Sequence, residues 1–401
     1  MSILAQHGFG DGNPGRIEAG LRAEVIDGCI LSPKDLSLAS LQSKIVGIRE
    51  INQSAKILFD PQYYASILGN IDNIRLGSLI SDYTDYFGPK HYKDLRREKN
   101  IRSEIEKVVR FQQRIGLSEI VFPGIMIQDG LKSESASIVK SFLEIGDEVA
   151  KDLNLSQQSW LTLALGESCF RDLKALQDLV DEITGMWLQS QGIYLLVETS
   201  NLDGNSPWCN SSVLSGQMYL VYALSLAGFK VTCGYSGLSA PYLAAAGASN
   251  VAFGWFETLR FFSLDRFMPS SGGGKRPKKK YLSRALWTRL DSGLLRALVA
   301  AHPELLNGSI HDQLFTNGSP TEKDEIVQHW NAVGTFCNDL SKSESVPLKI
   351  ANLRLQLLRS EQIKARIPTL SLPGFDERIA QTKAALRRFE DLAELSLSEQ
   401  D

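Results

Sequence analysis

The chain has 401 residues, more than a single hydrophobic core usually holds, so we expect one large domain with a smaller appendage. Its composition of 43% hydrophobic and 22% charged residues, with a net charge of -3, is that of an ordinary globular protein and excludes a disordered chain. The same balance excludes a protein that is basic overall, so any site for a nucleic acid must be local.

Cysteine usage and hydropathy indicate the compartment. The five cysteines are scattered and never form a Cys-x-x-Cys pair, which argues against a disulfide framework and a structural zinc site and fits a reducing cytoplasm. The first twenty residues lack the pattern of an export signal. Segment 217–256 carries one charge, Lys230, but its glycines lie too close together for a membrane-spanning helix. We therefore expect a cytoplasmic protein without a membrane partner, in which this segment forms buried helices and strands.

Eight short segments share one pattern, an apolar run that ends in polar or small residues and is followed by a helical stretch. They are 3–7, 24–33, 56–62, 119–127, 160–167, 192–200, 230–236 and 250–255. Such runs suit parallel strands buried on both faces. Eight strand–helix units predict an α/β fold, a (β/α)8 TIM-type barrel over residues 1–268. The shortness of the first run leaves an open sheet of seven strands as the alternative.

Three further segments complete the predicted organisation. An insertion at about 65–116 follows the third strand, on the functional face of a barrel, where it would serve as a lid. Residues 269–280 form a flexible basic segment. Residues 281–401 are predicted to be an α-helical C-terminal extension, because apolar residues recur there with helical spacing. The first stripe comprises Leu286, Leu290, Leu294, Leu295 and Leu298, and 350–358 and 379–389 are two further candidate helices.

Polar residues at the strand ends are the catalytic candidates, because the carboxyl ends of barrel strands converge on one mouth. Glu167 and Glu198 end neighbouring strands, so their carboxylates could split their pKa values and serve as acid, base or nucleophile. Asp60 and His7 would assist them. The alternative is that these carboxylates pair with Lys34 or with loop arginines and only shape the cavity. No spacing typical of metal ligands occurs, so we predict no metal ligands and no cofactor, although the set could accept a divalent metal.

Other residues near the strand ends are candidates for contacts with a substrate. They are Lys34, Gln62, Asn201, Tyr235, Ser236, Trp255 and Glu257. The stretch 230–254 resembles strands seven and eight of the phosphate-binding (β/α)8 barrels, in which small residues let backbone N–H groups approach a phosphate. The resemblance implies phosphate contacts at Gly234, Gly237 and Gly254. The alternative is that these glycines permit close helix–strand packing, and the bulk of Trp255 suggests that it stacks on a ring instead.

A cluster of positive charge lies in the predicted basic segment. It consists of Lys275, Arg276, Lys278, Lys279 and Lys280. Mobile basic segments often track phosphate backbones, so nucleic-acid contact is expected here. The alternative is a solvated linker.

The leading hypothesis is a barrel enzyme of the hydrolase or glycosyl-transfer type, acting on a phosphorylated, nucleotide-like or nucleic-acid substrate through carboxylate chemistry. In layout, a barrel with a basic appendage is similar to the transglycosylases that exchange tRNA bases, whose cysteine-rich zinc signature is missing here. The alternative is a nonenzymatic protein that binds nucleic acid or a protein partner through the basic segment and the extension. A second copy of the chain could be that partner, which would make a homo-oligomer.

Overall fold

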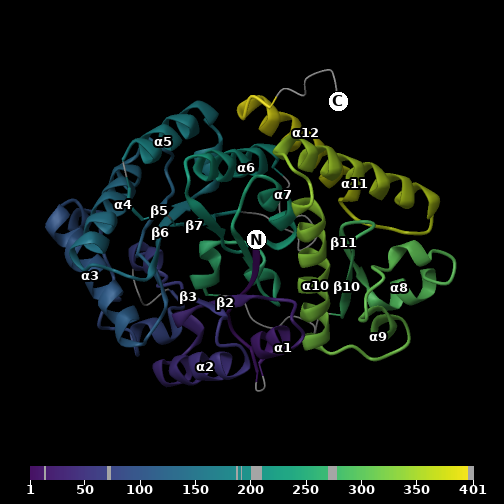
Figure 1. Cartoon of the computed structure of the whole chain (residues 1–401), viewed down its shortest axis with the longest axis horizontal. Coiled ribbons are helices and arrows are strands. Elements are labelled where there is room, and N and C mark those ends of the chain that lie inside the picture. Colours follow the sequence, from purple (N-terminus) through teal and green to yellow (C-terminus); the bar gives the residue numbers. More distant parts are fainter. Residues whose placement is uncertain are drawn as a thin grey trace.

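The centre of the protein is a sheet of parallel strands rolled into a barrel (Figure 1). The computed structural model describes residues 1–12, 15–69, 74–186, 188–190, 192–199, 210–269 and 278–395. The strands are β1 (Ser2–Gln6), β2 (Gly28–Leu31), β3 (Lys56–Phe59), β4 (Glu119–Val121), β5 (Met126–Ile127), β6 (Gln158–Leu165), β7 (Gly192–Val197), β8 (Lys230–Cys233) and β9 (Asn250–Phe253). They pair in the order β3, β2, β1, β9, β8, β7, β6, β4, and β5 also pairs with β6. The short β1 therefore lies between β2 and β9, and the barrel prediction is confirmed.

The barrel is nearly closed, with its seam between β3 and β4, the two ends of the strand order. Segment 119–127, predicted as one strand, is divided into β4 and β5, which both pair with β6. Pro123 and Gly124 lie between them, and a proline has no N–H for a strand ladder. A Cβ on Gly124 would lie 2.9 Å from the Thr162 carbonyl oxygen, so this break packs directly on β6.

Helices cover the outside of the barrel (Figure 1). They are α1 (Arg16–Arg22), α2 (Leu38–Ile51), α3 (Glu98–Arg114), α4 (Glu134–Asp152), α5 (Leu173–Gly185), α6 (Ser211–Leu226) and α7 (Ala240–Ala245). Side chains that accept backbone N–H groups begin several of them, such as Ser133 at α4 and Asp172 at α5. Segment 217–256 forms part of α6, then β8, α7 and β9, as interpreted from its glycines. Across the described residues, we find no helix with the length and apolarity that crossing a bilayer requires.

The described part of the 65–116 insertion contributes to the wall and core of the barrel, and Arg75 near its start lies at the barrel mouth. Its C-terminal part is α3, the helix that follows β3 on the outer wall. Its N-terminal part supplies Tyr83 and Tyr86, both buried, whose rings pack with Phe59 of β3 and Phe111 of α3. The tyrosines that suggested a functional loop are therefore part of an aromatic core beside the seam.

The C-terminal region begins with a β-hairpin, which the helical spacing did not predict. The antiparallel strands β10 (Lys280–Ser283) and β11 (Thr288–Asp291) precede five helices: α8 (Ser292–Leu298), α9 (Asp312–Thr316), α10 (Glu322–Ser341), α11 (Val346–Arg366) and α12 (Phe375–Leu392). The helix expected from Leu286 starts only at Ser292, because Leu286 and Leu290 are buried residues of the hairpin. The helices expected at 350–358 and 379–389 are confirmed as parts of α11 and α12.

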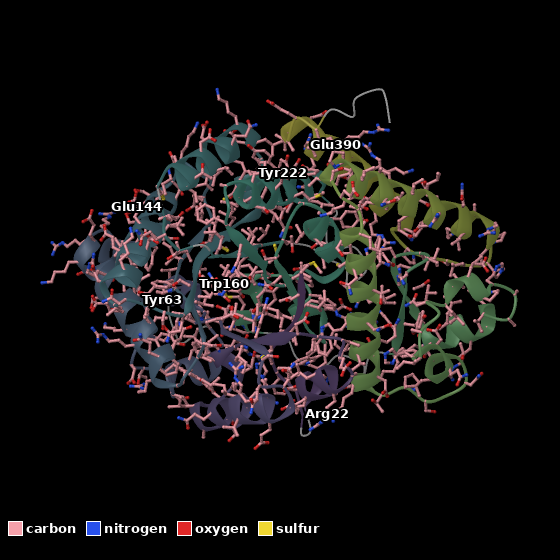
Figure 2. The ribbon with its side chains drawn as sticks, in the orientation of Figure 1. Arg22, Tyr63, Glu144, Trp160, Tyr222 and Glu390 are labelled. Carbon is pink, nitrogen blue, oxygen red and sulfur yellow. The ribbon has the colours of Figure 1, made fainter. Side chains whose placement is uncertain are left out.

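This extension packs on the barrel wall. Helix α10 lies along α1 and α7, and α12 lies along α6 (Figure 1). Figure 2 shows Tyr63 and Trp160 within the interior and Glu144 on the outer side of α4; the first two are buried and Glu144 is exposed. The buried apolar side chains form one cluster that runs from the barrel into the extension. Barrel and extension therefore share a hydrophobic core.

Candidate active site at the barrel mouth

The alternation of side chains along β1 separates Gln6 from His7. Ala5 pairs with Phe253, whose ring faces Trp330 of α10 on the outside of the barrel. His7 therefore also faces outward, and Gln6 faces the interior. The His7 ring lies edge-on to the Trp255 ring at 6.0 Å. Burial lowers the pKa of His7 to about 4, so the ring is neutral near pH 7.

Asp60 is the centre of a buried polar network inside the mouth. Its Oδ2 accepts the hydroxyl of Tyr64 at 2.8 Å and that of Tyr194 at 3.3 Å, and its Oδ1 accepts the backbone N–H of Gln62 at 2.9 Å. Burial raises the pKa of Asp60, while these three hydrogen bonds act in the opposite direction. The network holds the Asp60 carboxylate in place, and both of its oxygens already accept hydrogen bonds from the protein.

Glu198 and Glu167 lie on the other side of the mouth. Glu198 accepts the backbone N–H of Leu264 at 3.2 Å, and Glu167 accepts the side-chain amide of Asn210 at 3.3 Å. Burial raises the pKa of Glu198, and the charges of Asp265 and Glu167 raise it further. The two glutamates are thus near enough for the charge of Glu167 to act on Glu198. The hydrogen bonds of Asp60 are with Tyr64, Tyr194 and Gln62, and those of the two glutamates are with Leu264 and Asn210.

A segment after β9, residues 256–268, crosses the mouth and is here called the mouth segment. It is tied to the end of β7 by the Thr199 N–H, which donates to Phe262 O at 3.0 Å, and to the loop after β3 by the Arg75 N–H, which donates to Phe267 O at 2.6 Å. The Phe262 ring packs on Tyr64 and Tyr235 below it. The mouth segment therefore covers the barrel, and Arg75 of the 65–116 insertion is hydrogen-bonded to it.

A cavity of about 460 Å³ lies against this segment and is here called the mouth cavity. Its lining comprises Phe9, Lys34, Asp35, Arg75, Thr199, Phe256, Thr258, Leu259, Phe261, Ser263, Asp265, Arg266 and Met268. Three of these side chains are cations and two are carboxylates. Arg266 lies 3.2 Å from Asp35 and donates to the Tyr235 hydroxyl, and Lys34 lies 3.2 Å from the same carboxylate. Two cations therefore share a single aspartate at the wall of the cavity.

Of the predicted substrate contacts, Lys34 lines the mouth cavity and Asn201 lies outside the described residues. Gln62 and Tyr235 lie beneath it, and both have positive φ angles, 51° and 53°, which are rare for residues other than glycine. Ser236 is buried and donates to Cys233 O at 2.7 Å. Trp255 is 5% exposed, so it offers no open face on which a ligand could stack.

Two of the three glycine N–H groups of the resembled phosphate site donate to carbonyl groups of the protein. The N–H of Gly234 donates to Leu195 O at 3.0 Å, and that of Gly254 donates to Leu259 O at 2.8 Å. A Cβ on Gly254 would lie 2.4 Å from Gln6 O, and a Cβ on Gly237 would lie 2.4 Å from Arg260 O. These glycines permit close packing of the chain, which is the alternative weighed from the sequence.

The described part of the basic segment is partly neutralised. Lys279 lies 3.1 Å from Glu322 and Lys278 lies 3.7 Å from Asp291, while Lys280 begins β10. Lys275 and Arg276 lie outside the described residues. In the described ranges no group of His, Cys, Asp and Glu side chains is arranged to hold a metal ion.

Sequence reasoning missed Phe9, Arg75, Asp265 and Arg266, which lie in loops beyond the strand ends. It also missed the run 10–15, which has glycines at the positions of a Gly-x-Gly-x-x-Gly motif between β1 and α1. In the described part of this run, the N–H groups at the helix start already have a partner. The Asp11 carboxylate accepts the N–H of Arg16 at 2.6 Å and that of Ile17 at 3.4 Å, so a side chain of the protein occupies the place of an anion.

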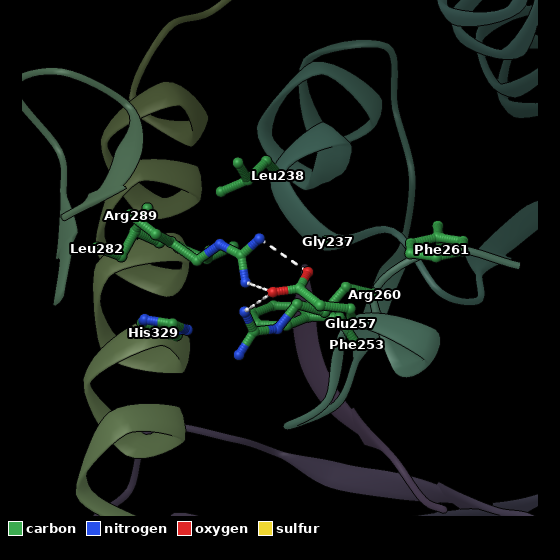
Figure 3. Close-up of a pocket in the computed structure, with 10 residues that line it drawn as sticks. Gly237, Leu238, Phe253, Glu257, Arg260, Phe261, Leu282, Arg289 and His329 are labelled. Carbon is green, nitrogen blue, oxygen red and sulfur yellow. Dashed lines mark hydrogen bonds and ion pairs between the residues drawn. The ribbon is translucent and has the colours of Figure 1, made fainter. Parts of the chain in front are cut away.

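A second, much smaller pocket, of about 20 Å³, lies between the barrel and the extension (Figure 3). There Glu257 of the mouth segment accepts two hydrogen bonds from Arg289 of β11, and Arg260 lies 3.7 Å from the same carboxylate. Both arginines are 7% exposed. Burial raises the pKa of Glu257, but the two arginines outweigh this effect and lower it. Glu257, predicted to bind substrate, here joins the mouth segment to the extension.

We expect Glu257→Gln to lower the free energy of unfolding by about 1–3 kcal/mol, because two buried arginines lose their carboxylate. The value lies below that of a fully buried ion pair because the Glu257 side chain is 41% exposed. Urea unfolding followed by circular dichroism measures the change. The exposed Glu144→Gln is the matched control, and an equal effect of both variants would contradict the assignment.

Comparison with known proteins adds no family. No protein-family model and no curated protein matches the chain significantly. Among solved structures, it is similar to the carboxyl transferase domain of Rhizobium etli pyruvate carboxylase. The structure with 3-bromopyruvate is 11% identical, with 84% of this chain and 48% of that chain covered and a TM-score of 0.32. The structure with pyruvate is 12% identical, with 98% and 62% covered and a TM-score of 0.33. The chain thus spans less than two thirds of these chains, and scores this low carry no argument about function.

Proposed function

We propose that the protein is an enzyme that acts on a phosphorylated substrate bound in the mouth cavity. The observation that carries this proposal is the cavity itself, which lies at the carboxyl ends of the strands and is lined by Lys34, Arg75 and Arg266. Active sites of barrel enzymes lie at this end of the fold, and arginine and lysine side chains suit phosphate oxygens. The cations outnumber the lining carboxylates, Asp35 and Asp265, by one.

Glu198 is the residue to which we assign acid–base chemistry. Its neighbour Thr199 and its partner residues Leu264 and Asp265 belong to the wall of the cavity or directly adjoin it. A carboxyl group whose pKa is raised by burial remains protonated nearer to neutral pH, which suits a general acid. Glu167, whose charge contributes to this shift, is the second carboxylate, so the reaction type is hydrolysis or glycosyl transfer.

A nonenzymatic role in binding nucleic acid has less support. The ion pairs of Lys278 and Lys279 reduce the charge that the described part of the basic segment can offer to phosphates.

The test is turnover of a panel of sugar phosphates and nucleoside monophosphates, followed by chromatography of the products. We expect wild-type turnover of at least one compound, and loss of about 100-fold or more in Glu198→Gln, because general acid–base catalysis commonly contributes that much. If Glu198 is the acid, the rate declines as the pH rises through its raised pKa, and the variant loses this limb of the profile. Glu144→Gln should retain full activity. No turnover of any compound would refute the proposal, and full activity of Glu198→Gln would refute the assignment of Glu198 as the acid.

A further inference from the structure

The rim of the mouth cavity is aromatic and apolar. Phe9 is 77% exposed and Met268 is 38% exposed, and Phe256 and Phe261 are half-buried beside them. Single exposed apolar side chains are common on protein surfaces, but a group of them around one cavity indicates a surface that a ligand covers. The rim thus favours a ligand with a flat apolar part.

Phe9 is held in place by the residues behind it. Its carbonyl oxygen accepts the Trp255 indole N–H at 2.9 Å. The Arg16 guanidinium lies 5.5 Å from the Trp255 ring centroid and 5.7 Å from that of Phe256, so one cation stacks behind both rings. Gly10, with a φ of 76°, turns the chain directly after Phe9. The exposed ring therefore belongs to a braced loop, which lowers the entropy lost when a ligand stacks on it.

The wall of the cavity is polar and cationic. The Arg266 guanidinium lies 5.2 Å from the ring centroid of Tyr235 and 5.5 Å from that of Phe267, and it is 3.2 Å from Asp35. Lys34 reaches the other oxygen of Asp35 at 3.2 Å. Both charged groups are largely buried, so solvent screens them less than surface cations. The two cations exceed the charge of Asp35 by one, and an anionic group bound beside them would offset this excess.

We infer that the ligand of the mouth cavity is a nucleotide, with its base against Phe9 and Phe256 and its phosphate near Lys34, Arg75 and Arg266. A ring and a phosphate on one molecule match the two surfaces that the cavity presents, and about 460 Å³ lies in the usual range for small-molecule sites. The inference deepens the proposed function, on which it rests, by naming the substrate class. The same chemistry is present in a free nucleotide and at the 5′ end of a nucleic acid.

Isothermal titration calorimetry with the full chain tests the inference without requiring turnover. The probes are AMP, adenosine, ribose 5-phosphate, inorganic phosphate and a 5′-phosphorylated oligoadenylate. We expect AMP to bind about tenfold or more tightly than ribose 5-phosphate, because base–aromatic stacking is worth about that factor. Adenosine should bind more weakly than AMP, because it lacks the charge-assisted contacts of the phosphate.

Two variants separate the surfaces. Phe9→Ala should weaken AMP about tenfold and leave ribose 5-phosphate unchanged, since Phe9 is exposed and its loss should not disturb the fold. Lys34→Gln should weaken AMP and ribose 5-phosphate alike, by about tenfold. Leu226→Ala, an exposed apolar residue at the end of α6, and Lys230→Gln, at the start of β8, are matched controls at the opposite end of the barrel.

The outcomes are distinct. Binding of AMP supports a free nucleotide, and binding of the oligoadenylate alone supports a nucleotide within a nucleic acid. Equal affinities for AMP and ribose 5-phosphate, or no effect of Phe9→Ala, would overturn the nucleotide inference while leaving a phosphorylated substrate in place. If no phosphorylated probe binds, both the inference and the proposed function fail. If AMP binds but Glu198→Gln retains full turnover, only the catalytic assignment fails.

Discussion

Trp330→Ala is expected to lower the free energy of unfolding by about 3–5 kcal/mol, the range for removing a buried large aromatic side chain. Trp330 is 0% exposed, and its indole N–H donates to Phe253 O of β9 at 3.0 Å. A Cβ on Gly20 of α1 would lie 2.8 Å from the indole, so the ring packs directly on the backbone of α1 at a position without a side chain. Because α10 inserts this ring against the barrel, the loss should destabilise barrel and extension together.

Urea unfolding followed by circular dichroism and by tryptophan fluorescence measures the effect. Trp330→Phe is the informative control, since it keeps much of the apolar volume and removes the N–H donor, and we expect it to cost about 1–2 kcal/mol. A loss below about 1 kcal/mol for Trp330→Ala, or a separate early transition of the extension with an unchanged barrel, would show that the two parts do not share one core.

The barrel was predictable because its signal is local. Most strands of the barrel are short continuous apolar runs followed by a stretch with helical spacing, and these two patterns can be distinguished along the chain. The hairpin of β10 and β11 was not, because Leu286 in the turn, Leu290 in β11 and Leu294 in α8 also fit a helical period. Trp287, in the turn of the hairpin, has a φ of 47°. A positive φ cannot be predicted from the residue type tryptophan.

The location of the candidate site was predictable from the sequence, but most of the residues that line it were not. Strand ends led to Asp60, Glu167 and Glu198, but the sequence does not tell which side chains a loop carries back across the mouth. Arg266 follows the end of β9 by 13 positions and reaches Asp35, which lies after β2. Such a contact depends on the path of the mouth segment, which is set by long-range packing of Phe262 on Tyr64 and Tyr235. The prediction also left out the alternation of side chains along a strand, which turns His7 outward.

That outward position makes His7 a determinant of acid stability. Burial lowers its pKa to about 4 in the folded protein, compared with 6.5 for an unperturbed histidine. Between these values the unfolded chain holds a proton that the folded protein does not, so the unfolded state is favoured as the pH falls. The stabilisation is complete above pH 6.5 and is lost on acidification through pH 4. Its size is about 3 kcal/mol, because each unit of pKa shift corresponds to about 1.4 kcal/mol.

His7→Gln should therefore flatten the dependence of unfolding free energy on pH between 6.5 and 4, as measured by urea titrations at half-unit steps. His91→Gln, at an exposed histidine, should leave the dependence unchanged. The wild-type slope will also contain His329, because burial, followed by the charges of Arg260 and Arg289, lowers the pKa of that ring well below its ordinary value. A slope that persists in His7→Gln and disappears in His329→Gln would place the acid-sensitive group at the junction with the extension, and the assignment to His7 would be wrong.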